Sequence, residues 1–191
     1  MNTECRWSQD LYTDCFKFAA TAHEGRKEPD FGLPYVAHIA LVSMEIMAAL
    51  SLDASADGDL AVSCALLHDI LEDTNVVYDD LLRQFGKGTA EGVLALTKNK
   101  EIGKGYSDKL AVNNMRIKDS LKKILKQPRE IWMVMMAERI VNLQPPPPEW
   151  GKDQVNNSLT QAIAIFAHLR TASHLLAARL EDKIMVYKAY C

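Results

Sequence analysis

The chain has 191 residues, of which 48% are hydrophobic and 25% are charged. This length is enough for one domain with a sizeable core and is short for two. The net charge of −3 leaves no strongly basic face of the kind that binds nucleic acid. No apolar run reaches the roughly 18 residues of a membrane span. We therefore expect neither a nucleic-acid partner nor a membrane.

Four cysteines are widely spaced and form no Cys-x-x-Cys pair: Cys5, Cys15, Cys64 and Cys191. This pattern is typical of reduced thiols in a cytosolic protein. The first residues lack the charged and apolar regions of a signal peptide. We expect a soluble, cytoplasmic protein, and the sequence leaves the oligomeric state open, a homo-oligomer included.

In the first half of the chain, apolar residues recur near the helical period of 3.6. Helices are expected over Ser8–His23 and Val36–Leu50, joined by a loop over 24–33 that contains glycine and proline. A polar break over 53–59 precedes Leu60–Leu71. Because that last segment is nearly all apolar, it predicts a buried central helix.

The second half of the chain is also helical in pattern. Short helices are expected over Val77–Phe85 and Thr89–Leu96, separated by Gly86. The later elements are a charged connector over 98–104, an amphipathic helix over 106–126, a Met-rich helix over 129–143, an extended arm at Pro145–Pro148 and one or two helices over 156–190. No segment alternates as a strand does, so the sequence predicts an all-α single domain.

A polar quartet interrupts the apolar central segment: His68, Asp69, Glu72 and Asp73. On a continuous helix, residues four apart share a face, so His68 would stack with Glu72 and Asp69 with Asp73. Burying such groups is costly unless they are paired or bound to a cation.

Two more residues of the same chemistry lie elsewhere in the chain, His38 upstream and Glu138 downstream. Imidazole together with carboxylate suits a transition metal such as manganese, iron, zinc or nickel better than calcium. The set therefore indicates a site for one divalent metal ion. An ordinary core histidine or a surface pair is the alternative for any one of these residues alone.

Together these motifs resemble the HD-domain phosphohydrolases, and within them the guanosine polyphosphate (ppGpp) hydrolase domain of RelA/SpoT-type proteins and its small stand-alone branch. The matching stretches are 22–27, 34–38, 65–74, 85–86, 96–98 and 137–143, with further likeness in the tail at 144–150 and 176–180. The resemblance covers roughly residues 11–190. It implies a single HD-type helical bundle over residues 1–191, with a core at about 11–143 and C-terminal helices at about 153–190.

The resemblance also implies roles for the matching residues. The metal ligands would be His38, His68, Asp69 and Glu138. Glu72 and Asp73 would orient or activate the attacking water, and Arg26, Lys27 and Asn142 would contact the nucleotide. The expected ion is manganese, with iron, zinc, nickel and magnesium as alternatives.

The sequence departs from the family pattern in three ways. Glu138 stands where the family has an aspartate, so its carboxylate is one methylene further from the backbone. Met135 replaces a lysine that usually precedes this segment. Arg26 and Lys27 follow His23 more closely than is typical, so their match to the family's basic pair, or their place in a solvated loop, stays open.

The resemblance implies metal-dependent hydrolysis of guanosine 3′,5′-bis(diphosphate) to GDP and pyrophosphate, with a guanine nucleotide as the substrate. An HD phosphohydrolase acting on another nucleotide or phosphorylated metabolite is the first alternative. The departures at Glu138 and Met135 motivate the second alternative, a nucleotide-binding protein without catalytic activity.

Overall fold

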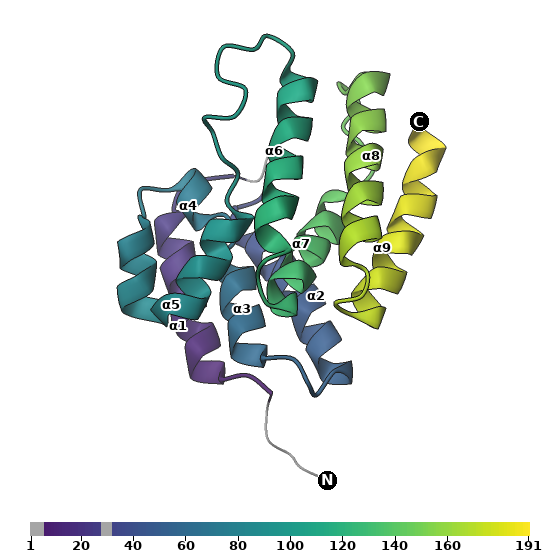
Figure 1. Ribbon diagram of the computed structural model, residues 1–191. Helices are drawn as coiled ribbons and strands as arrows, with labels where there is room; N and C mark the ends of the chain where they lie inside the picture. The colour runs from purple at the N-terminus through teal and green to yellow at the C-terminus, as the bar shows by residue number, and fades with distance from the viewer. Residues whose placement is uncertain (1–5, 28–31) are drawn as a thin grey trace.

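The computed structural model describes residues 6–27 and 32–191 of the chain. This part is helical apart from its loops and one isolated bridge between Lys27 and Pro34, which confirms the all-α prediction (Figure 1). The helices are α1 (Gln9–Ala22), α2 (Val36–Leu52), α3 (Gly58–Leu67), α4 (Ile70–Asp73), α5 (Tyr78–Leu96), α6 (Lys109–Ile124), α7 (Arg129–Asn142), α8 (Lys152–Leu169), α9 (His174–Tyr187) and a final 3₁₀ turn, η1 (Lys188–Tyr190).

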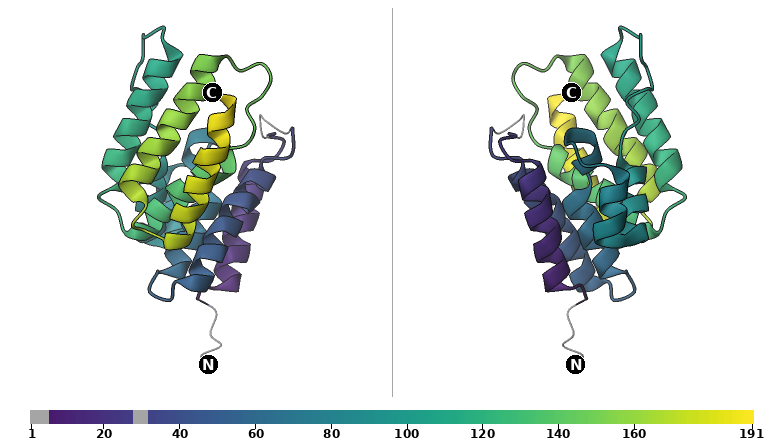
Figure 2. Two further views of the ribbon diagram at one scale, coloured as in Figure 1. Left: turned by 90° about the vertical axis from the view of Figure 1, so that its right-hand side faces the viewer. Right: turned by 90° about the vertical axis from the view of Figure 1, so that its left-hand side faces the viewer.

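The short helix α3 lies at the centre of the bundle and packs against α1, α2, α5 and α7. Its residues from Ala61 to Leu67 are all buried, as expected of an apolar central helix. Helices α6 and α8 pack side by side and project beyond the rest of the bundle, and α9 packs against α7 and α8 (Figures 1 and 2). None of the described helices is long and apolar enough to cross a membrane.

The prediction of one continuous helix over residues 60–71 is wrong at His68 and Asp69. Helix α3 ends at Leu67, and the one-turn helix α4 begins at Ile70. The backbone turns at Asp69, where ψ is 0°, and the Asp69 carbonyl accepts the N–H groups of both Glu72 and Asp73. Because of this tight turn, the four polar residues do not share one continuous helix. His68 and Asp69 precede α4, whereas Glu72 and Asp73 lie within it.

The expected division at Gly86 is confirmed. Gly86 has a φ of 80° and a ψ of 173° inside the segment that forms α5, so the helix is kinked there. A residue with a Cβ atom rarely adopts this backbone conformation. Pro145–Pro148 lie between α7 and α8 and outside any helix, as expected, but the segment bends and ends in a turn closed by the bond from Trp150 N–H to the Pro147 carbonyl.

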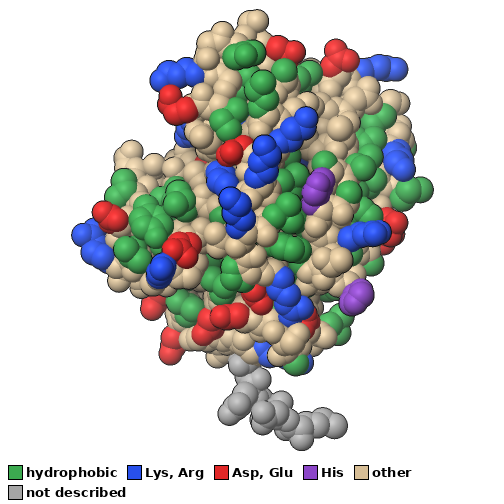
Figure 3. Space-filling model, viewed as in Figure 1, with side chains coloured by type: hydrophobic (Ala, Val, Ile, Leu, Met, Phe, Trp, Pro, Cys, Tyr) green, Lys and Arg blue, Asp and Glu red, His purple; other side chains and the backbone are tan. Residues whose placement is uncertain are grey.

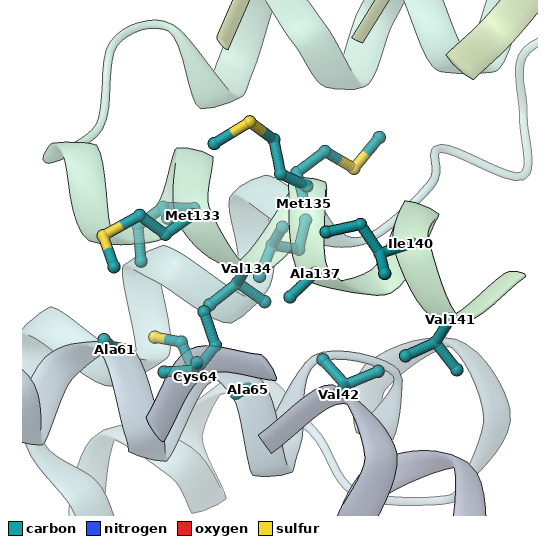
Figure 4. Packing of buried hydrophobic residues seen from close by; sticks show 14 of the residues in the cluster. Val42, Ala61, Cys64, Ala65, Met133, Val134, Met135, Ala137, Ile140 and Val141 are labelled. Carbon is teal, nitrogen blue, oxygen red and sulfur yellow. The ribbon is translucent and has the colours of Figure 1, made fainter. Parts of the chain in front are cut away.

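The methionines of α7 pack in the core, as the sequence predicts. Met133 and Met136 are fully buried and Met135 is 3% exposed. Figure 4 shows α7 above α2 and α3, with Val134 over Cys64 and Val141 near Val42. Cys15 and Cys64 are free thiols, and burial raises the pKa of Cys15 to about 12. Cys5 lies outside the described residues.

Two glycines of α5 allow a matched test of this packing. A Cβ atom at Gly92 would lie 2.5 Å from Ile131 Cδ1 and 2.7 Å from Cys64 Sγ, both in the packed core. We expect Gly92→Ala to lower the free energy of unfolding by about 1–3 kcal/mol through overpacking. At Gly88 the nearest atom would be Leu60 Cδ1, at 3.6 Å. Gly88→Ala should therefore raise stability by up to about 1 kcal/mol through helix propensity. Urea unfolding that showed equal effects would contradict this packing.

Candidate metal centre and nucleotide pocket

Three of the predicted ligands meet at one buried point, although they come from separate elements. His38 lies in the first turn of α2, while His68 and Asp69 form the turn between α3 and α4. The Nε2 atoms of His38 and His68 are 3.2 Å apart, and Asp69 Oδ2 lies 3.0 Å from His68 Nε2 and 3.8 Å from His38 Nε2. One ligand atom from each residue lies within 4.8 Å of the other two.

A backbone contact sets the orientation of His68. Its Nδ1 atom lies 2.8 Å from the carbonyl oxygen of Ala65, one turn earlier in α3. In the neutral imidazole Nδ1 donates its proton to that carbonyl, so Nε2 carries a lone pair. The lone pair faces the Asp69 carboxylate and the second histidine, which is the arrangement expected of a metal ligand.

Without a metal ion, His68 and Asp69 strongly shift each other's pKa. Burial lowers the pKa of His68, but the adjacent Asp69 carboxylate outweighs it and raises that pKa to about 9. Burial likewise raises the pKa of Asp69, and attraction to His68 lowers it far below its usual range. A positive charge is therefore favoured between these side chains.

Tyr35 is a contributor that the sequence analysis missed. Its hydroxyl donates a short hydrogen bond to Asp69 Oδ2, and its ring stacks on the buried His23 at a centroid distance of 4.7 Å. Burial is the largest cause that raises the pKa of Tyr35, so the phenol stays protonated and keeps donating. The sequence did contain a signal that Tyr35 lies near the site, since Tyr35 lies three residues before His38 and such residues share a helical face.

Glu72 and Glu138 lie beside the cluster, and the Lys98 side chain lies between them. The Glu72 carboxylate accepts the backbone N–H of Lys98 at 2.5 Å, and the Lys98 ammonium lies 3.6 Å from Glu72 and 4.0 Å from Glu138. Asn142 donates to Glu138 at 3.4 Å. Burial raises the pKa of Glu72, and Lys98 opposes that rise. Glu138 lies outside the group formed by the two histidines and Asp69.

The structure separates Arg26 from Lys27. The Arg26 guanidinium forms an ion pair with Asp73 at 2.8 Å and lies over the Tyr35 ring at 4.9 Å. Arg26 lines the pocket, whereas Lys27 is exposed and lies outside the pocket lining. The motif suggests that the two act as a pair, but neighbouring residues in an extended segment point to opposite sides.

A pocket of about 480 Å³ opens over the cluster, within the range of small-molecule sites. His38, Asp69, Glu72, Asp73 and Glu138 line one end. The other end is formed by α6, α8 and the segment before α8, through Leu110, Asn113, Ile117, Trp150, Gln154, Asn157, Ser158 and Gln161. Lys and Arg side chains gather on the outward face of α6 (Figure 3). They make that face attractive to anions.

These residues fit a divalent metal ion. Two imidazoles and one carboxylate are a donor set that suits transition metals. Their ligand atoms are too close and too buried to be left without a shared cation or proton. His38 and Asp69 line the pocket, so an ion held here would be accessible to a substrate.

Comparison with known proteins identifies the class. The profile of the HD domain matches residues 15–175, so the chain belongs to the HD domain family, which implies a divalent metal. It is 25% identical over 177 residues to the guanosine-3′,5′-bis(diphosphate) 3′-pyrophosphohydrolase MESH1 of Drosophila melanogaster, over 90% of this chain and 91% of that protein.

Longer relatives carry the same name. The chain is 34% identical over 128 residues to the guanosine-3′,5′-bis(diphosphate) 3′-pyrophosphohydrolase of Haemophilus influenzae, and the match spans 66% of this chain and 17% of that enzyme. A solved structure of a metazoan ortholog of SpoT, described as hydrolysing ppGpp, superposes with a TM-score of 0.75 at 22% identity, over 93% of this chain and 96% of that one. This likeness confirms the fold.

The Tyr35 hydroxyl provides a direct test of the metal centre. We expect Tyr35→Phe to weaken divalent metal binding by roughly 10- to 100-fold, because Asp69 loses the hydrogen bond that orients it. Calorimetric titration with Mn²⁺ measures this. Tyr12→Phe is the control, since the Tyr12 hydroxyl contacts Ser43 away from the cluster. Equal affinities in the Tyr35→Phe variant and the unaltered protein would contradict the assignment.

Metal binding should also release a proton. With a pKa of about 9, His68 is protonated at pH 7, and a metal binds only the neutral imidazole. We expect about one proton released per ion at pH 7, and an affinity that rises about tenfold per pH unit until pH nears 9. Calorimetry in buffers of different ionisation enthalpy counts the protons. An affinity independent of pH would contradict this.

Proposed function

We propose that this protein hydrolyses guanosine 3′,5′-bis(diphosphate), and the corresponding pentaphosphate, to GDP or GTP and pyrophosphate. The observation that carries the proposal is the buried cluster of His38, His68 and Asp69 at one end of a nucleotide-sized pocket. The substrate follows from relatives named for this reaction, one of which matches nearly the whole chain. In the reaction, water attacks the phosphorus bonded to O3′, and the P–O3′ bond breaks to leave the ribose hydroxyl.

The two histidines and Asp69 hold the metal in this proposal, with manganese as the ion and Glu138 as a fourth ligand. A divalent ion in such a site polarises a phosphoryl oxygen and makes a nearby water more acidic. The contact between Ala65 and His68 and the hydroxyl of Tyr35 keep the ligand atoms aligned. For Glu138 to ligate, its carboxylate must turn from Lys98 toward the cluster, and the longer side chain of glutamate gives it that reach.

Glu72 is assigned to accept a proton from the attacking water, with Asp73 beside it. Burial raises the pKa of Glu72, which makes its carboxylate a better proton acceptor. Lys98 holds the Glu72 carboxylate through both its backbone N–H and its ammonium group. The carboxylate is therefore oriented before the substrate enters.

The nucleotide contacts are assigned to Arg26, Lys27 and Asn142. The Arg26 guanidinium lies over the Tyr35 ring and is held by Asp73, and a planar guanidinium offers both a stacking surface and hydrogen-bond donors. Asn142 lies one helical turn after Glu138 and lines the pocket. Lys27 would need to reach the nucleotide from the rim.

Asp69→Asn tests the proposal. The amide no longer supplies a charged ligand, so the rate of pyrophosphate release should fall by more than the roughly 100-fold that loss of an outer-sphere partner can cost. Ion-exchange chromatography of the nucleotides over time measures the conversion of guanosine tetraphosphate to GDP. The exposed Asp79 gives a matched control, and Asp79→Asn should keep the full rate. Hydrolysis by Asp69→Asn at the rate of the unaltered protein would refute the proposal.

A further inference from the structure

Arg139 is a buried cation of the pocket lining that forms no ion pair with the described residues. It lies on α7 directly after Glu138, is 9% exposed and contributes to the pocket lining. Its Nε atom has no hydrogen-bond partner. Across residues 6–27 and 32–191, no ion pair joins the Arg139 guanidinium to a carboxylate. Burial lowers the pKa of Arg139, and attraction to the neighbouring Glu138 and to Tyr187 opposes that shift.

The other buried charges that the structure describes are paired. Glu45 accepts two hydrogen bonds from Arg179, at 2.5 and 2.6 Å. Glu130 accepts the N–H of Asp57 at 2.9 Å and lies 3.7 Å from Arg129. Because a buried charge without an ion pair is costly to a fold, Arg139 is an exception that calls for a ligand.

The charges of the pocket are divided between its two ends. The carboxylates lie at the end that holds the metal cluster, whereas the wall from α6 and α8 carries amides, a hydroxyl and apolar groups and no carboxylate. Arg26 and Lys98 also line the pocket, but Arg26 is paired with Asp73 and Lys98 with Glu72 and Glu138. Among the cations of the lining that the structure describes, Arg139 is thus the one that forms no ion pair.

We propose that Arg139 binds the diphosphate on the 5′ oxygen of the substrate while the 3′ diphosphate lies at the metal cluster. This inference rests on the proposed function, whose substrate carries two diphosphates on one ribose. A guanidinium suits phosphate because it donates parallel hydrogen bonds. The amides of the α6 and α8 wall add neutral donors without an opposing charge. Arg139 would then select nucleotides that are phosphorylated at the 5′ end.

Binding of GDP and of guanosine, measured without turnover, tests this assignment. GDP carries the 5′ diphosphate and guanosine does not. In the unaltered protein we expect GDP to bind at least about tenfold more tightly than guanosine, as charged hydrogen bonds imply. In Arg139→Met that advantage should fall to within about twofold, with guanosine affinity unchanged. Arg83→Met is the control, since it removes the same charge from an arginine with 75% of its side chain exposed.

Thermal unfolding distinguishes a binding role from a structural one. Replacing a buried, unpaired charge with an apolar side chain of similar length should leave the melting temperature unchanged or raise it. A lower melting temperature together with equal losses of GDP and guanosine binding would show a structural role and overturn the proposal. Equal GDP affinities in Arg139→Met and the unaltered protein would overturn it too, as would GDP and guanosine binding equally well to the unaltered protein.

A parallel hydrolysis assay separates this inference from the proposed function. If guanosine tetraphosphate is hydrolysed and GDP affinity does not depend on Arg139, the inference fails and the function stands. If GDP binding depends on Arg139 and no hydrolysis occurs under any divalent metal, the 5′ subsite stands and the proposed reaction fails.

Discussion

Two imidazole nitrogens and a carboxylate oxygen occupy one buried point in this protein, and much of the local structure serves to hold them there. The two Nε2 atoms are 3.2 Å apart, and one of them lies 3.0 Å from Asp69. Lone pairs repel at such distances unless a proton or a cation lies between them. The break between α3 and α4 brings His68 and Asp69 to this point, and the first turn of α2 brings His38.

The same constraint organises the surrounding charges. Glu72 and Asp73 lie outside the cluster and form ion pairs with Lys98 and Arg26, so cations orient the two acidic groups next to the candidate metal site. Two cations of the described pocket lining, Arg26 and Lys98, are therefore in ion pairs, and the third, Arg139, is not. The division into an acidic end and a neutral end then matches a substrate with one reacting phosphate group and one that is only bound.

Much of the fold could be predicted from the sequence because helical periodicity is a local property. The boundaries of α1 and α2, the kink at Gly86 and the buried methionines of α7 all follow from short stretches of chain. The break at His68 and Asp69 could not be predicted, because the apolar pattern continues on both sides of it. The meeting of His38, His68 and Asp69 followed from the motif resemblance and is present in the structure.

Other parts of the site depend on tertiary contacts that no local pattern encodes. Lys98 lies 26 residues from Glu72 in the chain, and its position between Glu72 and Glu138 follows from the loop that precedes α6. The amide wall needs α6 and α8 to pack side by side. Tyr35 shares a short motif with His38, but its bond to Asp69 becomes evident only once α2 and the turn before α4 are brought together.

We propose that one ion, bound by His38, His68 and Asp69, makes the protein active. The most direct measurement is a titration of metal-stripped protein with Mn²⁺ in which bound metal and hydrolysis of guanosine tetraphosphate are followed in the same samples. The account predicts no turnover without metal and a rate that rises in proportion to the first equivalent bound. Full turnover in the stripped protein, or saturation of the site with no turnover, would contradict it.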